Sequence, residues 1–329
     1  MQTRTFGRTG LEFSRLTFGC GAVGGLMTKG EAVDQDRAVA WARDHGINHF
    51  DTAPSYGNTA SETNLGRALG TNRDDIFVST KVGVTEEHRS DLAGAIRSSL
   101  EASLMRLAQD HVDIFQLHNT LEDPSDQRGN LSADQVLEEI VPTFEKLRDE
   151  GKTRYIGFTA KGSTKALHRL VSSEKFDSAQ IFYNMVVPSA GQVVPNGYPG
   201  QDYRELLTTA EQKGVGTIGV RVLAGGALSG SQARHPLGNQ NVTPIGSSGT
   251  YAEDIARALK FQPLIEAGHA ENLPELAIRY VISDSKLSTV EIGIATINEL
   301  QKAASAVIKG PLSEEAIAQI ADIQNGFAA

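Results

Sequence analysis

The sequence predicts an α/β fold, a single (β/α)8 or TIM barrel with long loops at its C-terminal face. Short apolar runs alternate with amphipathic runs along most of the 329 residues, which is typical of a parallel sheet covered by helices. The alternation resolves into eight strand–helix units. No Pro-, Gly- or Ser-rich linker divides the chain, so we expect one domain over residues 1–329 rather than a doubly wound sheet with a second domain.

Each expected strand is a short, mostly apolar run bounded by polar residues or glycine. Glycines also mark the expected helix ends, as Gly46, Gly70 and Gly151 do, and Asp34 is the expected N-cap of the first helix. In chain order, the expected strands are residues 15–19, 47–50, 76–80, 112–117, 154–158, 179–182, 215–222 and 289–292. The expected helices are residues 34–45, 61–69, 91–107, 132–150, 163–171, 203–212, 251–259, 274–282, 296–307 and 311–323.

Composition and charge exclude several classes of function. The formal net charge is −9 and the basic residues are scattered, which argues against nucleic acid as a partner. The only cysteine is Cys20, so no intrachain disulfide can form. The N-terminus lacks the apolar run of a signal peptide, and no stretch approaches 18 uninterrupted apolar residues. We therefore expect a cytoplasmic protein without a membrane partner, either a monomer or a small homo-oligomer.

A glycine motif offers a competing interpretation. Residues 19–24 read G-x-G-x-x-G directly after a strand, and Asp51 stands where a Rossmann fold would hold a ribose. In that fold the last glycine opens a helix whose N-terminus meets the pyrophosphate. Here the next helix is expected only at about Asp34, so we interpret residues 19–24 as a flexible first loop at the mouth of the barrel.

Four reactive side chains stand at or just beyond successive strand ends. Asp51 follows the second strand and Tyr56 lies in the same loop, while Lys81 follows the third strand and His118 the fourth. Taken singly, each residue also has a purely structural interpretation. Asp51 could cap a helix or turn, and Tyr56 could be an aromatic side chain on the barrel rim. Lys81 could be a solvated residue at a strand end, and His118 a packed or hydrogen-bonded histidine. In a closed barrel these strand ends are neighbours on one rim, so the four side chains can converge.

Hydride transfer to a carbonyl group requires such a set. The carbonyl oxygen becomes an alkoxide and needs a proton, which a tyrosine can give. A nearby lysine is expected to lower the pKa of Tyr56, and Asp51 would hold the charge of Lys81. His118 could hydrogen-bond the carbonyl oxygen and orient it. A metal site is the alternative for Asp and His, but no second histidine lies at ligand spacing from His118, so no metal is expected.

At these residues the chain resembles the aldo-keto reductase family over nearly its whole length. The family's aspartate–tyrosine motif is similar to residues 51–57 followed by Ser61-Glu62, its lysine motif to residues 79–82, and its histidine motif to residues 112–118. The resemblance implies a (β/α)8 barrel, a nicotinamide dinucleotide extended over its rim, and a tyrosine acting as general acid.

The resemblance also implies a set of cofactor-binding positions, with two departures from the family pattern. Thr159-Ala160 stands where the family usually has the Ser-Asn pair that holds the carboxamide. Residues 220–228 lack the aromatic side chain that usually stacks on the nicotinamide, and Arg221 is unusual there. The implied cofactor-binding residues are Gly21, Ala22, Thr159, Gln180, Val220, Arg221, Leu223, Gly225, Leu228, Ile294, Ala295, Thr296, Glu299 and Ala303.

The last loop and helix bear on the choice between NAD(H) and NADP(H). Glu299 falls where the family often carries an arginine, and only Lys302 is basic nearby. A carboxylate there would repel a 2′-phosphate. We therefore expect NAD(H), or weak discrimination between the two cofactors.

These observations predict an NAD(P)-dependent oxidoreductase that acts on a small carbonyl or alcohol substrate, such as an aldehyde, a ketone or a sugar. The alternative is a catalytically weak, nicotinamide-binding regulatory module of the same fold. Substrate identity is expected to reside in four loops, namely residues 21–29, 119–130, 185–200 and 225–249, none of which contains a diagnostic set of residues.

Overall fold

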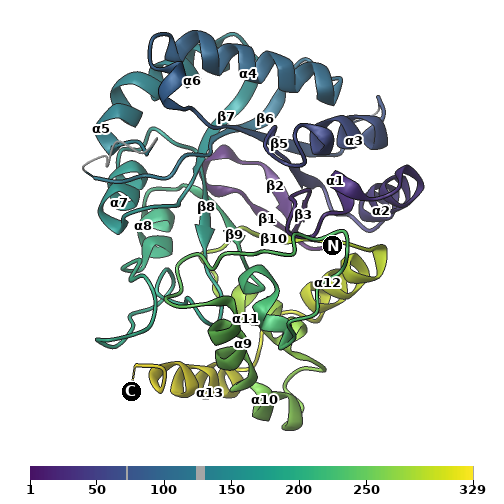
Figure 1. Ribbon diagram of the computed structural model, residues 1–329, viewed down its shortest axis with the longest axis vertical. Coiled ribbons are helices and arrows are strands. Elements are labelled where there is room, and N and C mark those ends of the chain that lie inside the picture. The colour runs from purple at the N-terminus through teal and green to yellow at the C-terminus, as the bar shows by residue number, and fades with distance from the viewer. Residues whose placement is uncertain (72, 124–129, 329) are drawn as a thin grey trace.

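The computed structural model describes residues 1–71, 73–123 and 130–328, and it confirms the closed barrel of eight parallel strands. All eight predicted strands are present. Figure 1 shows them surrounded by helices. In order around the barrel, they are β10 (Thr289–Gly293), β3 (Leu16–Gly19), β4 (His49–Asp51), β5 (Phe77–Val82), β6 (Val112–Leu117), β7 (Thr153–Thr159), β8 (Ser178–Phe182) and β9 (Gly216–Val220).

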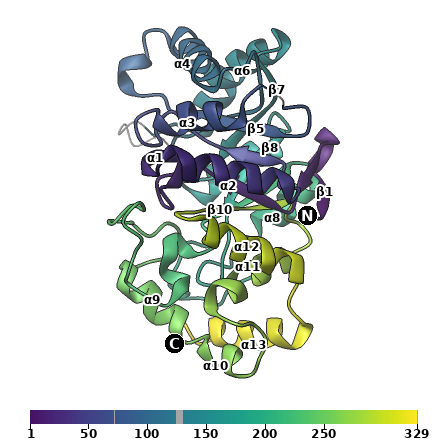
Figure 2. The ribbon, with the colours of Figure 1, turned by 90° about the vertical axis from the view of Figure 1, so that its right-hand side faces the viewer.

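The helices form an outer layer, and those of the C-terminal part gather on one side of the strands (Figures 1 and 2). Among the described residues, no helix is long and apolar enough to cross a membrane. The α-helices are α1 (Leu26–Lys29), α2 (Ala32–Asp44), α3 (Ala60–Leu69), α4 (Leu92–Leu107), α5 (Ala133–Gln135), α6 (Val141–Asp149), α7 (Thr164–Ser172), α8 (Leu206–Gln212), α9 (Tyr251–Leu259), α10 (Gln262–Glu266), α11 (Leu273–Ser283), α12 (Ile297–Lys309) and α13 (Glu314–Asn325). Shorter helical turns are η1 (Gly7–Thr9), η2 (Glu86–His88), η3 (Val136–Ile140, a π-helix between α5 and α6) and η4 (Ala224–Ser229).

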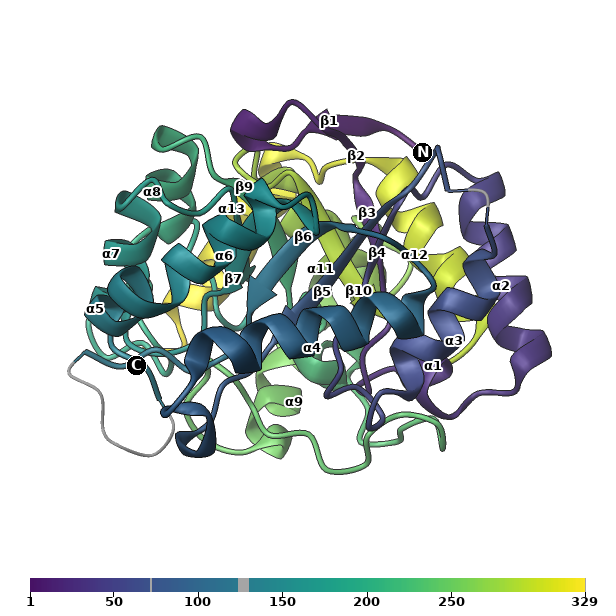
Figure 3. The same ribbon diagram turned by 90° about the horizontal axis from the view of Figure 1, so that it is seen from above.

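The sequence analysis missed an N-terminal hairpin that covers one end of the barrel. Strands β1 (Thr3–Thr5) and β2 (Glu12–Ser14) pair antiparallel, and η1 joins them. Phe6 and Phe13 stack with ring centroids 4.2 Å apart and pack against Ile114 and Ile218 inside the barrel. Figure 3 shows this hairpin and the α9 segment at opposite ends of the strands. The hairpin therefore closes the floor of the barrel and leaves the C-terminal face to the site.

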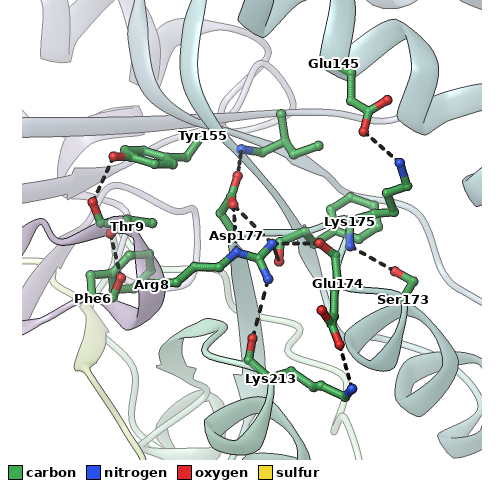
Figure 4. A network of polar contacts seen from close by, with 12 residues as sticks. Phe6, Arg8, Thr9, Glu145, Tyr155, Ser173, Glu174, Lys175, Asp177 and Lys213 are labelled. Carbon is green, nitrogen blue, oxygen red and sulfur yellow. Dashed lines mark hydrogen bonds and ion pairs between the residues drawn. The ribbon is translucent and has the colours of Figure 1, made fainter.

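Polar contacts fix the hairpin to the strand starts (Figure 4). The guanidinium of Arg8 donates to Asp177 Oδ1 at 3.2 Å and to the carbonyl oxygen of Phe176 at 2.9 Å. Tyr155 Oη donates to the carbonyl oxygen of Thr9 at 2.9 Å. These bonds tie the hairpin to β7, which carries Tyr155, and to Asp177, which immediately precedes β8.

Some predicted helix starts are wrong by a few residues. Helix α2 has Glu31, not Asp34, as its N-cap, and Asp34 lies in the first turn, where its charge suits the positive end of the helix. Helix α8 begins at Leu206 rather than residue 203, because Arg204 and Glu205 have positive φ angles of 49° and 54° that are not helical.

The glycine motif lies in a barrel loop, as expected, although a one-turn helix follows it sooner than predicted. Gly25 is the N-cap of α1 and has a φ of 92°, which favours glycine. Gly24 packs so tightly on the backbone of Ile294 that a Cβ atom would collide with it. The glycines therefore allow this loop to approach the segment after β10, and the closed barrel rules out the Rossmann interpretation.

Two of the loops expected to carry substrate specificity differ in how much is described. Residues 124–129, within the predicted loop 119–130, lie outside the described residues. The loop after β9 is described in full. Its Asn239 N–H donates to the carbonyl oxygen of Ala22 at 2.9 Å, so it meets the first loop.

Candidate active site

A cleft of about 890 Å³ opens at the C-terminal ends of the barrel strands, and this volume is in the range of cofactor sites. Tyr56 and His118 line one end. Most of the predicted cofactor-binding residues also line it: Gly21, Ala22, Thr159, Gln180, Val220, Arg221, Leu223, Gly225, Ala295, Glu299 and Ala303. Leu228, Ile294 and Thr296 do not; Leu228 and Ile294 are buried in the core, and the Thr296 side chain caps α12.

A buried ion pair lies behind Tyr56. Lys81 and Asp51 are fully buried, and Lys81 Nζ donates to Asp51 Oδ1 and, at 2.9 Å, to the carbonyl oxygen of Thr52. Burial alone would lower the pKa of Lys81, but the carboxylate of Asp51 outweighs it and holds this pKa above its ordinary value. Lys81 is therefore charged at neutral pH, and Asp51 supplies the counter-charge expected from the sequence.

Several hydrogen bonds orient Asp51. Its Oδ2 accepts from Ser79 Oγ at 2.6 Å and from Gln116 Nε2 at 3.0 Å. His49 Nε2 lies 2.9 Å from Ser79 Oγ, and His49 Nδ1 lies 2.8 Å from Thr17 Oγ1. Because Ser79 donates to Asp51, it accepts from His49, which assigns the ring proton to Nε2. The carboxylate is therefore held by a chain of partners through the barrel interior.

Strand β5, which carries Lys81, is also fixed from outside the barrel. Thr80 Oγ1 donates to the buried Glu62 Oε1 at 2.5 Å, and Arg106 Nε donates to Glu62 Oε2 at 2.7 Å. Glu62 belongs to the Ser61-Glu62 pair of the sequence motif. The motif thus connects helices α3 and α4 to the residue that precedes Lys81.

Tyr56 brings the four predicted residues together. Lys81 Nζ lies 4.9 Å from the centroid of its ring, and the His118 ring meets it edge-on with centroids 5.9 Å apart. A Cβ atom on Gly21 would stand 3.6 Å from the same ring, so Gly21 leaves space beside it. The structure therefore places Asp51, Tyr56, Lys81 and His118 in one cluster, as the sequence predicted.

The pKa values of Tyr56 and His118 follow from burial. Burial raises the pKa of Tyr56 and Lys81 lowers it; burial is the larger effect, so the pKa lies above its ordinary value. The lowering by Lys81 that the sequence predicted is therefore present, but burial outweighs it, because a buried phenolate loses its solvation. Burial, assisted by Lys81, lowers the pKa of His118 to about 4. At neutral pH Tyr56 can donate a proton and His118 is uncharged.

Sequence reasoning missed a further carboxyl group near the cluster, that of Glu291. Glu291 on β10 lines the cleft, and its Oε2 accepts from Gln180 Nε2 at 2.9 Å. Gln180 Oε1 accepts from Thr159 Oγ1 at 2.9 Å. The alternation of side chains along β10 could have indicated it. Val290 and Ile292 face one side of the strand, so Glu291 faces the other side, inward with Thr289 and Gly293.

Two further charged residues of the cleft, Glu299 and Arg221, bear on the cofactor. The Glu299 carboxylate accepts from the Ala295 N–H at 2.7 Å, and Thr296 Oγ1 accepts from the Glu299 N–H at 3.2 Å. Glu299 therefore places negative charge at the N-terminus of α12. Arg221, in turn, has a φ of 57° and donates to the Thr243 carbonyl oxygen at 3.2 Å, so it contacts the loop after β9.

Arg234 is a second functional candidate that the sequence did not single out. It lines the cleft and donates to Asn239 O at 2.6 Å, to Gly225 O at 2.7 Å and to Tyr251 Oη at 2.8 Å. A lone arginine in a Gly- and Ser-rich loop gives no sequence signal. Among the described residues, no group of three or more His, Cys, Asp or Glu side chains could hold a metal ion.

The fold and the site define a class, that of (β/α)8 barrels whose functional cleft lies at the C-terminal ends of the strands. The aldo/keto reductase family model matches residues 15–325, and the chain belongs to this family.

Individual relatives agree with this assignment. An L-galactose dehydrogenase of Arabidopsis thaliana is 30% identical over 319 residues, which cover 93% of this chain and 88% of that protein. A probable voltage-gated potassium channel subunit beta of Arabidopsis thaliana is 26% identical over 337 residues, with coverage of 95% and 93%. The holo form of an aldo-keto reductase from Bacillus halodurans has a TM-score of 0.74 at 23% identity, covers 98% of this chain and 96% of its own, and shares the fold.

Proposed function

We propose that this chain transfers a hydride between a nicotinamide cofactor and a carbonyl or alcohol substrate, with Tyr56 as the general acid or base. The supporting observation is the cluster in which Lys81, held by Asp51, lies 4.9 Å from the ring of Tyr56 while His118 meets the edge of that ring. A proton donor and a neutral imidazole thereby line the same cleft, and the cation lies behind the proton donor.

Each residue has a distinct part in this proposal. A nicotinamide cofactor bound in the cleft would supply or accept the hydride. Tyr56 gives its proton to the carbonyl oxygen as negative charge develops there, and His118 Nε2 or Nδ1 hydrogen-bonds that oxygen. Lys81 stabilises the phenolate left on Tyr56, while Asp51 keeps Lys81 charged within the barrel. For oxidation the same steps run backwards, and Tyr56 must first lose its proton.

We infer that the substrate is a sugar-like alcohol or the corresponding carbonyl compound. Support comes from the relative described as an L-galactose dehydrogenase, which matches most of both chains. The cleft also offers polar side chains beside Tyr56, including His118, Lys161 and Arg221, which suit hydroxyl groups.

The proposed cofactor is NAD(H), with NADP(H) used less efficiently. The carboxylate of Glu299 lies at the N-terminus of α12, an end that would otherwise attract a phosphate. Negative charge there opposes the 2′-phosphate by about 1 kcal/mol or more at an intermediate dielectric. Lys302 lines the same cleft and offsets part of this repulsion.

The cofactor preference is tested by measuring kcat/KM with NADH and NADPH for the wild type and Glu299→Gln. We expect the wild type to prefer NADH, and the substitution to raise kcat/KM with NADPH about tenfold while changing that with NADH little. Glu271→Gln, at an exposed residue that also lines the cleft, is the matched control. A wild type that prefers NADPH tenfold or more would contradict the assignment.

The function itself is tested by steady-state rates with both cofactors against free sugars, the matching sugar alcohols and aromatic aldehydes. We expect turnover with at least one sugar-like substrate. Tight cofactor binding without turnover of any substrate would instead favour the regulatory module, a role with less support because all four reactive residues are present and assembled.

A further inference from the structure

We propose that the carboxyl group of Glu291 sets the preference of the site for oxidised over reduced nicotinamide, by placing negative charge beside the cationic ring of the oxidised form. This inference rests on the proposed function, since it requires a nicotinamide cofactor in the cleft. It assigns Glu291 an electrostatic task and no part in the proton or hydride transfer.

The position of Glu291 is built into the barrel. It points inward from β10, and Gly19 on the neighbouring strand β3 leaves space for it, since a Cβ atom there would stand 3.0 Å from Glu291 Cγ. Its Oε2 accepts from Gln180 Nε2, and Gln180 in turn accepts from Thr159. Glu291 thus fixes which way the Gln180 amide faces within the cleft.

Chemistry requires the nicotinamide ring to lie close to this group. Hydride goes to the carbonyl carbon while Tyr56 protonates the oxygen of the same carbonyl, so the hydride donor must lie near Tyr56. Glu291 lines the same end of the cleft and is close enough to perturb the pKa of Tyr56. Oxidised nicotinamide carries a positive charge on its ring and reduced nicotinamide does not, so a carboxylate at this depth favours the oxidised form.

The charge of Glu291 depends on pH within a useful range. Burial, followed by the charge of Asp51, raises the pKa of Glu291 to about 8. The other titratable groups that face it are Asp51 on β4, Lys81 on β5, and Tyr56 and Cys20 at the barrel mouth. The pKa of Asp51 is lowered and those of Lys81, Tyr56 and Cys20 are raised, which leaves Glu291 as the member of this set that titrates near pH 8.

The test measures Kd for NAD+ and for NADH, by calorimetry without substrate, from pH 6.5 to 9. In the wild type we expect the ratio Kd(NADH)/Kd(NAD+) to rise on the order of tenfold across this range, as Glu291 ionises. In Glu291→Gln, which keeps an oxygen acceptor for Gln180, the ratio should be lower at pH 9 and independent of pH. Glu87→Gln, at an exposed residue outside the cleft, should behave as the wild type.

The outcomes separate this inference from the proposed function. If Glu291 had a purely structural role, Glu291→Gln would weaken the binding of NAD+ and NADH alike. The ratio Kd(NADH)/Kd(NAD+) and its pH dependence would then be the same as in the wild type, which would overturn the inference. If the wild type binds neither NAD+ nor NADH but binds the phosphorylated pair, the same ratio is measured with NADP+ and NADPH. If it binds no nicotinamide cofactor, the proposed function itself fails.

Discussion

At the residue scale, the arrangement depends on one buried ion pair. Lys81 and Asp51 are both fully buried, and a buried pair of this kind adds little net stability compared with well-packed apolar residues. Removing one partner, however, leaves an uncompensated charge. We therefore interpret the pair as a device for keeping a charged amine beside Tyr56 rather than as a source of stability.

This interpretation predicts the behaviour of two variants. Asp51→Asn should lower the stability by about 3–5 kcal/mol, because Lys81 loses its counter-charge. The double variant Asp51→Asn with Lys81→Met should recover most of that loss, yet its kcat should stay at least a hundredfold below wild type. Urea unfolding and steady-state kinetics measure the two effects separately. Recovery of activity in the double variant would show that Lys81 is dispensable.

The sequence predicted that Asp51, Tyr56, Lys81 and His118 converge because their motifs are local and fall at strand ends; their catalytic roles stay a prediction. Glu291 was missed, since a single glutamate within a short strand looks like a solvated residue until the strand's inward face is known. The effect of burial on the Tyr56 pKa was also missed, because burial of the ring depends on loops that are distant in sequence.

At the element scale, strand β4 carries His49, a buried histidine whose altered pKa makes the stability of the fold depend on pH. Burial lowers the pKa of His49 to about 4, whereas an unfolded histidine titrates near 6.5. Between these values the unfolded chain binds a proton that the folded chain does not, so stability falls as the pH drops from about 6.5 towards 4. For the fully buried His49 this linkage amounts to roughly 3 kcal/mol.

A His49→Gln variant tests this linkage. We expect its urea midpoint to fall less than that of the wild type when the pH is lowered from 7.5 to 5, even if it is less stable at pH 7.5 through altered bonds to Thr17 and Ser79. His111→Gln, at an exposed histidine, is the control. The same pH slope in the His49 variant and the wild type would contradict the assignment.

The eight strands and most helices followed from sequence because their apolar periodicity is strong. The hairpin of β1 and β2 was not predicted, since its strands have three residues each and its role, closing the barrel floor with Phe6 and Phe13, depends on the completed barrel. The α8 boundary was misplaced because Arg204 and Glu205 have positive φ, and the Glu205 N–H donates to the carbonyl oxygen of Ser189, which is distant in sequence.

At the scale of the whole molecule, two loops far apart in sequence meet over the cleft. Arg234, in the loop after β9, donates to Asn239 O and Gly225 O, and Asn239 N–H donates to Ala22 O in the first loop. Tyr251 Oη at the start of α9 accepts from the same arginine at 2.8 Å. Arg234 therefore joins the two rims of the cleft, and we propose that it slows exchange of the cofactor.

An Arg234→Ala variant should release NADH about tenfold faster in stopped-flow fluorescence, because about 1.4 kcal/mol of loop contacts is lost. The rate of the chemical step, measured in a single turnover with bound cofactor, should change much less. Arg37→Ala, which removes an exposed ion pair with Asp34, serves as the control. Unchanged NADH release from the Arg234 variant would exclude this role.

The central claim is that Tyr56 transfers the proton. The most direct measurement is a comparison of Tyr56→Phe with the wild type in two assays, the Kd for NADH by fluorescence and the rate of NADH consumption or formation with the best substrate found. The account predicts a Kd within about threefold of wild type and a turnover lower by a hundredfold or more. A variant that keeps more than about a tenth of wild-type turnover with normal cofactor binding would contradict it.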